Sequence, residues 1–308
     1  MASATANAAS KPASPSFGRR LESCIHALLI GCAAISIFTT VGIVLVLLVE
    51  SLQFFRDVSI VEFLTGTKWT PLLSPKHYGI LPLVCGTMLV AGGSALIAIP
   101  LGLGTAVYLS EYASPTVRDV VKPLLEVLAG IPSVVYGYLA VVVVSPIVRA
   151  VLPSAGLFNA VNACVVVGIM ILPMIVSLSE DVLRSVPRSL REGGYALGAN
   201  KFDVTVGIVI PAAFSGVVAS FLLAISRAIG ETMAVSLAAG RTPKMTLDPR
   251  ESVQTMTSYI VQVSQGDTPA DSPEYRAIFA VGLALFVLTL AMNLVAQWIL
   301  RRVREQYE

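Results

Sequence analysis

Long runs without a charged side chain divide the sequence into alternating apolar and polar segments. Six runs contain no Asp, Glu, Lys or Arg: 25–49, 79–109, 127–148, 150–179, 204–226 and 277–300. Each exceeds the roughly 18 apolar residues that indicate a membrane span, because about 20 helical residues cross a hydrocarbon core of about 30 Å. The pattern therefore predicts an all-α integral membrane protein with about six transmembrane helices.

The composition supports this prediction. Of 308 residues, 55% are hydrophobic and only 13% are charged, whereas an ordinary soluble domain is about 25% charged. A soluble enzyme, a disordered chain and a small disulfide scaffold are therefore excluded. The net charge of +2 is too small to indicate a nucleic acid partner. No pair of the four cysteines has CxxC spacing, which favours small packing residues over metal ligands or a disulfide.

Three regions follow one another along the chain. Residues 1–18 are rich in Ala, Ser and Pro and are predicted to be a disordered cytoplasmic tail. Residues 19–78 are predicted to hold the first transmembrane helix and an outer segment lying at the membrane interface. Residues 79–308 are predicted to form the transmembrane core. The first apolar run is about twice the 7–15 residues of a secretory signal, so we expect it to remain as an anchor.

The basic residues indicate an orientation. With the N-terminus inside, the cytoplasmic segments hold twelve Lys and Arg residues and the outer segments hold eight. Because basic residues favour cytoplasmic loops, we expect both termini in the cytoplasm of a multi-pass protein of the cell membrane.

The sequence contains no motif of an enzyme. It has no GxxxxGK[ST] loop for ATP, no HExxH and no GxSxG, and its only histidines are His26 and His77. We therefore expect no catalytic residue, no metal site and no cofactor bound by this chain.

Arg227 and Glu231, in SRAIGETMAV, are the only opposite charges placed together deep in an apolar segment. If residues 204–240 form one helix, their spacing of four puts them on one face. An arginine at the bilayer centre costs about 2.5–3.5 kcal/mol, so the pair should face protein or water. A guanidinium matches an oxyanion such as phosphate, which indicates a permeation path. A structural ion pair is the alternative, and the pair would lie at the outer mouth if the span ends near Ile229.

A second informative stretch, REGGYALGANKFDVTVGIVIP, runs from Arg191 to Pro211. Pro187 begins a helical pattern and Gly198 could end a short helix. A short amphipathic helix in a cytoplasmic loop is suited to a groove of another protein, although a solvated connector would share this pattern.

The spacing of this stretch resembles the EAA loop of ABC importer permeases, written EAA, then G, then I-x-L-P. Glycines replace the two alanines, and Ile210 replaces the leucine. In that family the loop, here at about 187–211, forms coupling helices that seat in a cleft of the ATPase subunit. The resemblance implies that the ATPase coupling residues are Glu192, Gly193, Gly194, Gly198, Ile208 and Pro211.

Three further stretches, FLTGTKWTP at 63–71, IPSVVYG at 131–137 and GETMAV at 230–235, resemble the PstC family of phosphate permease subunits. This resemblance implies the fold of a type I ABC importer permease and uptake of inorganic phosphate. It implies a PstA-like permease subunit, a PstB-like ATPase dimer that carries ATP and Mg, and a PstS-like phosphate-binding protein as partners. It also implies that Arg227 and Glu231 line the substrate path.

Other functions stay open at this point. The pair chemistry alone does not separate phosphate from sulfate or molybdate. An ATP-independent channel or ion-coupled carrier would need no ATPase subunit but leaves the loop spacing unexplained. A structural membrane scaffold would use Arg227 only in an interface ion pair.

Overall fold

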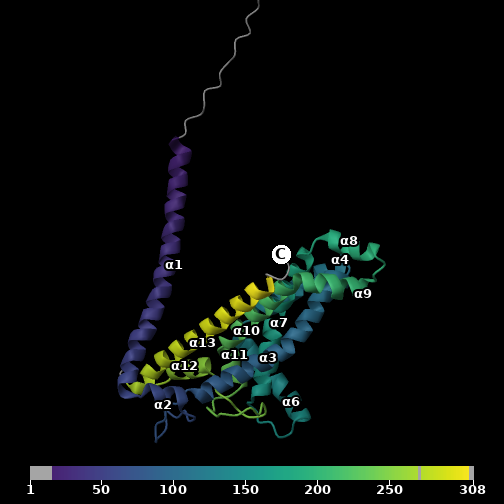
Figure 1. The fold of residues 1–308 in the computed structure, drawn as a ribbon. Coiled ribbons are helices and arrows are strands. Elements are labelled where there is room, and N and C mark those ends of the chain that lie inside the picture. The colour runs from purple at the N-terminus through teal and green to yellow at the C-terminus, as the bar shows by residue number, and fades with distance from the viewer. Residues whose placement is uncertain (1–15, 270–271, 305–308) are drawn as a thin grey trace, which may run out of the picture. The chain divides into compact units, whose positions relative to one another are not determined.

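The computed structural model describes residues 16–269 and 272–304, and the regular secondary structure within them is helical apart from one antiparallel bridge between Trp69 and Tyr78. Figure 1 shows the helices, whose bounds are α1 Ser16–Asp57, α2 Ile60–Thr65, α3 Leu81–Val107, α4 Pro115–Gly130, α5 Ser133–Leu139, α6 Ser145–Val151, α7 Ala160–Ser185, α8 Arg188–Ala196, α9 Lys201–Val204, α10 Ile210–Ile229, α11 Met233–Ala238, α12 Met256–Ser264 and α13 Pro273–Arg304. Wider π-helical turns join some of them: η1 Tyr108–Tyr112, η2 Ala140–Val144 and η3 Thr205–Val209. The predicted all-α fold is confirmed.

Six helical stretches in the described part of the chain are long and apolar enough to cross a membrane: Cys24–Asp57, Leu81–Tyr112, Ser133–Val151, Ala160–Ser185, Lys201–Ile229 and Pro273–Arg302. Each overlaps one charge-free run, so the predicted number of spans is confirmed. The charge-free run 150–179 is not helical throughout, because α6 ends at Val151 and α7 begins only at Ala160. Asn159 accepts a hydrogen bond from the Asn162 amide at 2.8 Å and so caps the start of α7.

The chain divides after Val49 into two compact units. The described part of the first unit is residues 16–49 of α1, where no described side chain is buried. Residues 1–18 are the predicted tail. Residues 1–15 lie outside the described residues, whereas residues 16–18 belong to α1, which begins at Ser16. In the second unit, α2 is a short helix within the segment predicted to lie at the membrane interface, and that location stays a prediction.

The core of the second unit forms where α3 lies along α7. Two glycines of α3 allow this close approach, because a Cβ on Gly93 would meet Cys164 Sγ at 2.3 Å and one on Gly102 would meet Ile175 Cγ2 at 2.6 Å. Buried side chains of α5, α10 and α11 complete the same hydrophobic cluster. Small residues at such contacts let helices pack closely in a membrane, where van der Waals contacts drive their association.

An aromatic cluster closes one end of the second unit. Phe54, Phe63, Trp69, Tyr78 and Tyr259 are all buried there, with their rings packed edge to face. Burial, and then the nearby Glu274 carboxylate, raise the pKa of Tyr78 to about 12. The Tyr78 hydroxyl therefore stays neutral and donates a hydrogen bond to Glu274 Oε1 at 3.3 Å. The cluster ties the loop after α2 to α12 and α13.

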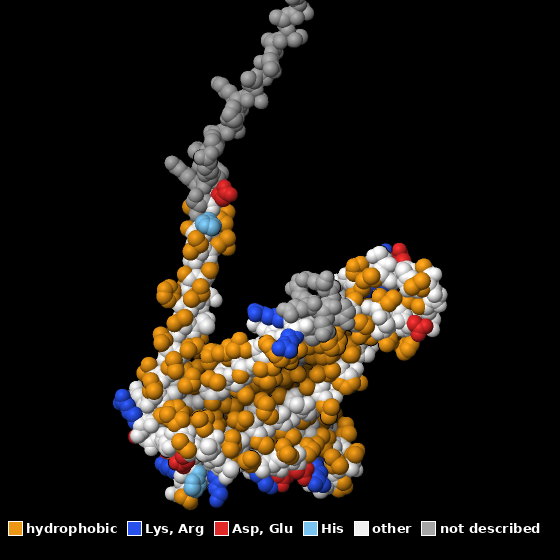
Figure 2. Space-filling model, in the orientation of Figure 1, with side chains coloured by type: hydrophobic (Ala, Val, Ile, Leu, Met, Phe, Trp, Pro, Cys, Tyr) orange, Lys and Arg blue, Asp and Glu red, His pale blue; other side chains and the backbone are white. Residues whose placement is uncertain are grey.

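The surface of the second unit matches a membrane environment. Figure 2 shows hydrophobic side chains across the middle of the visible face, with charged side chains toward both ends: one end holds α2 in Figure 1, and the other holds α8 and the end of α13. Exposed apolar side chains are what lipid or a neighbouring apolar helix requires.

Candidate functional site

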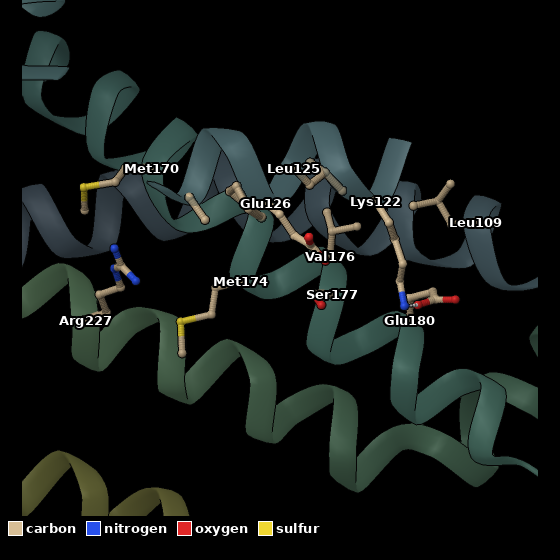
Figure 3. A pocket seen from close by; sticks show the side chains of 12 residues that line it. Leu109, Lys122, Leu125, Glu126, Met170, Met174, Val176, Ser177, Glu180 and Arg227 are labelled. Atoms are coloured by element: carbon tan, nitrogen blue, oxygen red, sulfur yellow. Dashed lines mark ion pairs between the residues drawn. The ribbon is translucent and has the colours of Figure 1, made fainter. Parts of the chain in front are cut away.

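A pocket of about 170 Å³ lies among α4, α7 and α10, and Arg227 forms one end of it. Its walls are mostly apolar, with a small set of polar side chains: Lys122, Glu126, Ser177, Glu180 and Arg227. Figure 3 shows Arg227 and Met170 at one end, Met174 further along, and the Lys122 and Glu180 side chains meeting at the other end. A few convergent polar groups in an apolar pocket are typical of a site for a small molecule.

The pocket places Arg227 beside the middle of α7. The side chain shares the pocket with Met170, Pro173 and Met174, which lie near the middle of α7 (Ala160–Ser185). Helix α10 does end at Ile229, yet Arg227 faces the middle of a neighbouring span. This placement favours a position inside the membrane region over one at its outer mouth.

Arg227 and Glu231 would lie on one face only if residues 204–240 formed one helix, and they do not. Helix α10 ends at Ile229 and α11 begins only at Met233. Arg227 and Glu231 therefore do not share one helix face, and no ion pair joins them among the described residues. The reason is local: glycine is a poor helix former, and Gly230 stands where the first helix stops.

Glu231 stabilises the helix break. Its side-chain Oε1 accepts a hydrogen bond from the Ala234 amide at 3.2 Å, in the first turn of α11, as a carboxylate at a helix start does. Its backbone carbonyl accepts from Thr257 Oγ1 at 2.8 Å. Interrupted backbone at membrane depth needs such partners, because no water is present in the hydrocarbon to supply them.

Arg227 is exposed in the isolated chain. Within the described residues no carboxylate lies within ion-pair distance of its guanidinium. A guanidinium offers five N–H donors in a planar fork that fits an oxyanion. The arrangement leaves a positive charge available to a ligand in the pocket.

The opposite end of the pocket holds a charge cluster that the sequence interpretation missed. The Glu180 side chain is completely buried, and Lys122 Nζ lies 2.5 Å from its Oε2. Arg184 lies 3.4 Å from Glu180 Oε1, and Lys122 also pairs with Asp181 at 3.1 Å. The contact with the Glu180 carboxylate raises the pKa of Lys122, although burial opposes it. Only the i,i+4 spacing of Glu180 and Arg184 was visible in the sequence, because Lys122 lies on α4, far from Glu180 along the chain.

The predicted coupling segment is built around a helix end. Helix α8 stops after Ala196, and Gly198 adopts a φ of +84°, a conformation that glycine adopts without strain. The Gly198 amide donates to the Tyr195 carbonyl at 2.9 Å. The predicted end of a short helix at Gly198 is confirmed. Glu192 and Gly193 are exposed on α8.

Two of the motif positions meet in the structure. A Cβ on Gly194 would lie 2.6 Å from Ile208 Cδ1 and 2.9 Å from Val204 Cγ2. Gly194 therefore lets α8 pack onto α9 and η3, and Pro211 stands where η3 passes into α10, inside the continuous helical stretch Lys201–Ile229. The packing connects this loop directly to the start of the span that carries Arg227.

An ion pair fixes α8 to the rest of the fold. Arg191 Nη2 lies 2.9 Å from Glu111 Oε1 in η1, and it also donates to the Leu183 carbonyl at 2.9 Å. A further guanidinium nitrogen donates to the Val186 carbonyl. Both charged side chains are largely buried. The sequence pattern flagged Arg191 only as the first residue of the motif stretch and gave no sign of its partner.

The loop exposes apolar side chains among its charged ones. The exposed hydrophobic side chains there are Leu190, Tyr195, Leu197 and Phe202, and Leu197 is 90% exposed. Such side chains on a short helix fit a hydrophobic groove of a partner.

The described residues offer no group of three or more His, Cys, Asp or Glu that could hold a metal ion. The four cysteines are free thiols.

Comparisons with known proteins agree with this geometry. Residues 98–305 match the family model described as "Binding-protein-dependent transport system inner membrane component". A "Probable ABC transporter permease protein YqgH" of Bacillus subtilis (strain 168) is 37% identical over 88% of both chains. A "Phosphate transport system permease protein PstC" of Mesorhizobium japonicum is 31% identical over 79% of both chains.

Solved structures show the same fold. One titled "Crystal structure of a bacterial ABC transporter involved in the import of the acidic polysaccharide alginate" matches with a TM-score of 0.60 and 15% identity, over 92% of this chain and 99% of the other. A MetNI methionine ABC transporter in an inward-facing conformation matches with a TM-score of 0.57 and 16% identity, over 72% of this chain and 95% of the other.

Proposed function

The chain belongs to the family of binding-protein-dependent transport system inner membrane components, and from that premise we propose that it is the permease subunit of an ATP-driven phosphate importer. The membership confirms two predictions from the sequence, the ABC importer permease fold and the resemblance to PstC-type permeases. It also places the chain among multi-span proteins of the inner membrane. Transport, with no covalent chemistry of its own, is the activity of such a subunit.

One observation carries the substrate proposal. Arg227 presents to a mostly apolar pocket beside the middle of α7 a guanidinium that has no ion-pair partner among the described residues. Two parallel hydrogen bonds from such a fork suit a phosphate oxygen pair. Relatives at about 30% identity carry names of phosphate permeases, which supports phosphate over other oxyanions.

Glu231 contributes to the path differently from the sequence hypothesis. Because its carboxylate accepts from the Ala234 amide, it holds the break between α10 and α11 open rather than neutralising Arg227. The Arg227 charge therefore stays free for the anion. Transport requires affinity weak enough for release, and the exposed setting of Arg227 supplies that weakness.

The proposed mechanism is alternating access with partner chains. A PstS-like binding protein delivers phosphate to a cavity between this subunit and a PstA-like subunit. Both termini are cytoplasmic, so α8 faces a PstB-like ATPase dimer, which binds ATP and Mg. Closure of that dimer moves α8. The motion reaches α7 and η1 through Arg191 and reaches α10 through the contact of Gly194 with Ile208.

Reconstitution tests this function. The complex with its co-encoded neighbours is placed in proteoliposomes with the binding protein, and uptake of labelled phosphate is measured with and without ATP. We expect uptake only with ATP, and competition by excess phosphate but not by sulfate or molybdate. Uptake without the ATPase subunit would contradict the mechanism, and preferential uptake of sulfate or molybdate would contradict the substrate.

A further inference from the structure

The pocket that begins at Arg227 has a second cationic end. Lys122 lines the same pocket, beside Glu180. Met170, near Arg227, and Glu180 are ten residues apart on α7, so the pocket extends about 15 Å along that helix at 1.5 Å per residue. Figure 3 shows the two cations at opposite ends of the row of α7 side chains.

The charges along this row nearly cancel. Two cations, Arg227 and Lys122, and two carboxylates, Glu126 and Glu180, line the pocket, while Asp181 and Arg184 lie beside the Lys122 end. An anion is attracted to Arg227, meets the Glu126 carboxylate along the pocket, and at the far end reaches Lys122, whose charge is balanced by Glu180. Such balance suits passage, because sites along a path must bind weakly enough to release the ion.

Lys122 has a donor left for a ligand. An ammonium has three N–H donors, and its charged contacts in the structure are two, at 2.5 Å to Glu180 and 3.1 Å to Asp181. Its side chain is 32% exposed whereas Glu180 is 0% exposed. Glu180 is thus the buried partner of the pair, and Lys122 keeps exposed surface at its end of the pocket.

Resting on the proposed function, we propose that Lys122 is a second station for the transported oxyanion, at the end of the pocket nearer α8, and that Glu180 is the positioning residue that holds it there. A tetrahedral oxyanion leaving Arg227 is received by the Lys122 ammonium, in competition with Glu180 and Asp181. The competition with these carboxylates lowers the affinity of the station and allows release from the path.

The plain alternative is that the Lys122–Glu180 pair only fastens α4 to α7. A double substitution separates the two roles. A buried ion pair can often be replaced by apolar residues of similar size without loss of stability. A fastening role therefore predicts that Lys122→Met with Glu180→Met transports normally, whereas a station predicts that the well-assembled double variant fails to transport.

The experiment compares the assembled wild-type and variant complexes in proteoliposomes. We expect Lys122→Met/Glu180→Met to lower uptake roughly tenfold or more, because the charge-assisted hydrogen bond to the anion is lost, while its thermal unfolding and its ATPase activity stay near wild type. Lys122→Gln tests the station without changing Glu180 and is expected to raise the KM for the anion. Normal uptake by the double variant, or by an assembled Lys122→Gln variant, overturns the proposal.

A matched control isolates the station. Arg118→Gln removes another positive charge of α4 that does not line the pocket. It is expected to transport at close to the wild-type rate. If Arg118→Gln loses uptake as severely as Lys122→Gln, net charge of the helix explains the effect and the station is refuted.

The same assay distinguishes failure of this proposal from failure of the proposed function. Phosphate, sulfate and molybdate are each offered as the labelled anion. If the wild type carries sulfate, the phosphate assignment fails, and the variants test the station on sulfate instead. If the wild type carries no oxyanion, both proposals are overturned.

Discussion

Arg191 and Arg227 show how one chain uses the same side chain in two opposite ways. Arg191, in the α8 loop, donates to the Glu111 carboxylate and to two backbone carbonyls, and only 16% of its side chain is exposed. Arg227, in the pocket, is exposed and has no ion-pair partner among the described residues. The charge of the first is used up by the fold, so it holds elements together. The charge of the second remains available to an anion.

The two regions should therefore fail differently. Changes in the loop are expected to alter coupling to the ATPase or the stability of α8, whereas changes in the pocket are expected to alter passage of the anion. Substitutions in either region can be ranked by how strongly they test this division.

The largest effect is expected in the pocket. Arg227→Gln should abolish phosphate uptake, because it removes the unpaired positive charge, and it should leave assembly intact because no ion pair is broken. Arg227→Lys is the matched control: it keeps the charge but loses the planar fork, so partial uptake is expected. The measurement is uptake in proteoliposomes alongside size-exclusion profiles of the complex. Normal transport by Arg227→Gln would show that the pocket is not the path.

The next effect is expected in the loop. Arg191→Gln leaves the Glu111 carboxylate, which is 6% exposed, buried without its partner. Breaking a buried ion pair in this way costs about 3–5 kcal/mol. We expect a lower thermal unfolding temperature and faster hydrogen exchange in α8.

Arg191→Met with Glu111→Gln is the control for this loss, since it removes both charges and should recover part of the stability. If Arg191→Gln instead leaves hydrogen exchange in α8 unchanged and abolishes only anion uptake, Arg191 does not act as a structural residue and the distinction drawn between Arg191 and Arg227 is wrong.

A smaller and more specific effect is expected at the end of α8. Gly198→Asp places a side chain at a φ of +84°, which costs about 1–2 kcal/mol for an L-residue. We expect ATP hydrolysis to continue without transport, because the helix end that meets the ATPase is displaced. The comparison is Gly193→Ala on the same helix, where a Cβ meets nothing within 4 Å. If ATP hydrolysis and transport remain tightly coupled in Gly198→Asp, the proposal that this loop contacts the ATPase loses its support.

The smallest effect is expected at the contact between α8 and η3. Gly194→Ala brings a Cβ to 2.6 Å from Ile208 Cδ1, the flexible end of a side chain that can move. Overpacking of this kind costs about 1–3 kcal/mol. Adding Ile208→Val, which removes that methyl group, should restore the unfolding temperature, and a double variant less stable than Gly194→Ala would contradict the contact.

The sequence by itself determined the spans and the family. Residues 79–109 and 277–300 carry no charge, and a helix is the structure that satisfies every backbone group of such a segment within itself in lipid. The end of α8 at Gly198 could also be predicted from the sequence, because glycine adopts a left-handed backbone conformation readily. The spacing of Glu192, Gly198 and Pro211 was enough to indicate an importer permease. Each of these signals is local, so it survives without knowledge of the fold.

The tertiary structure alone decided which charges meet. Glu111, the partner of Arg191, lies 80 residues away in the sequence, and Lys122 reaches Glu180 from a different helix. The break after Ile229 separated Arg227 from Glu231, although their spacing suggested one face. Helix formation follows from local pattern and the solvent, but partners across helices depend on which faces pack together. That choice is made by the summed fit of many distant side chains, which no short stretch of sequence contains.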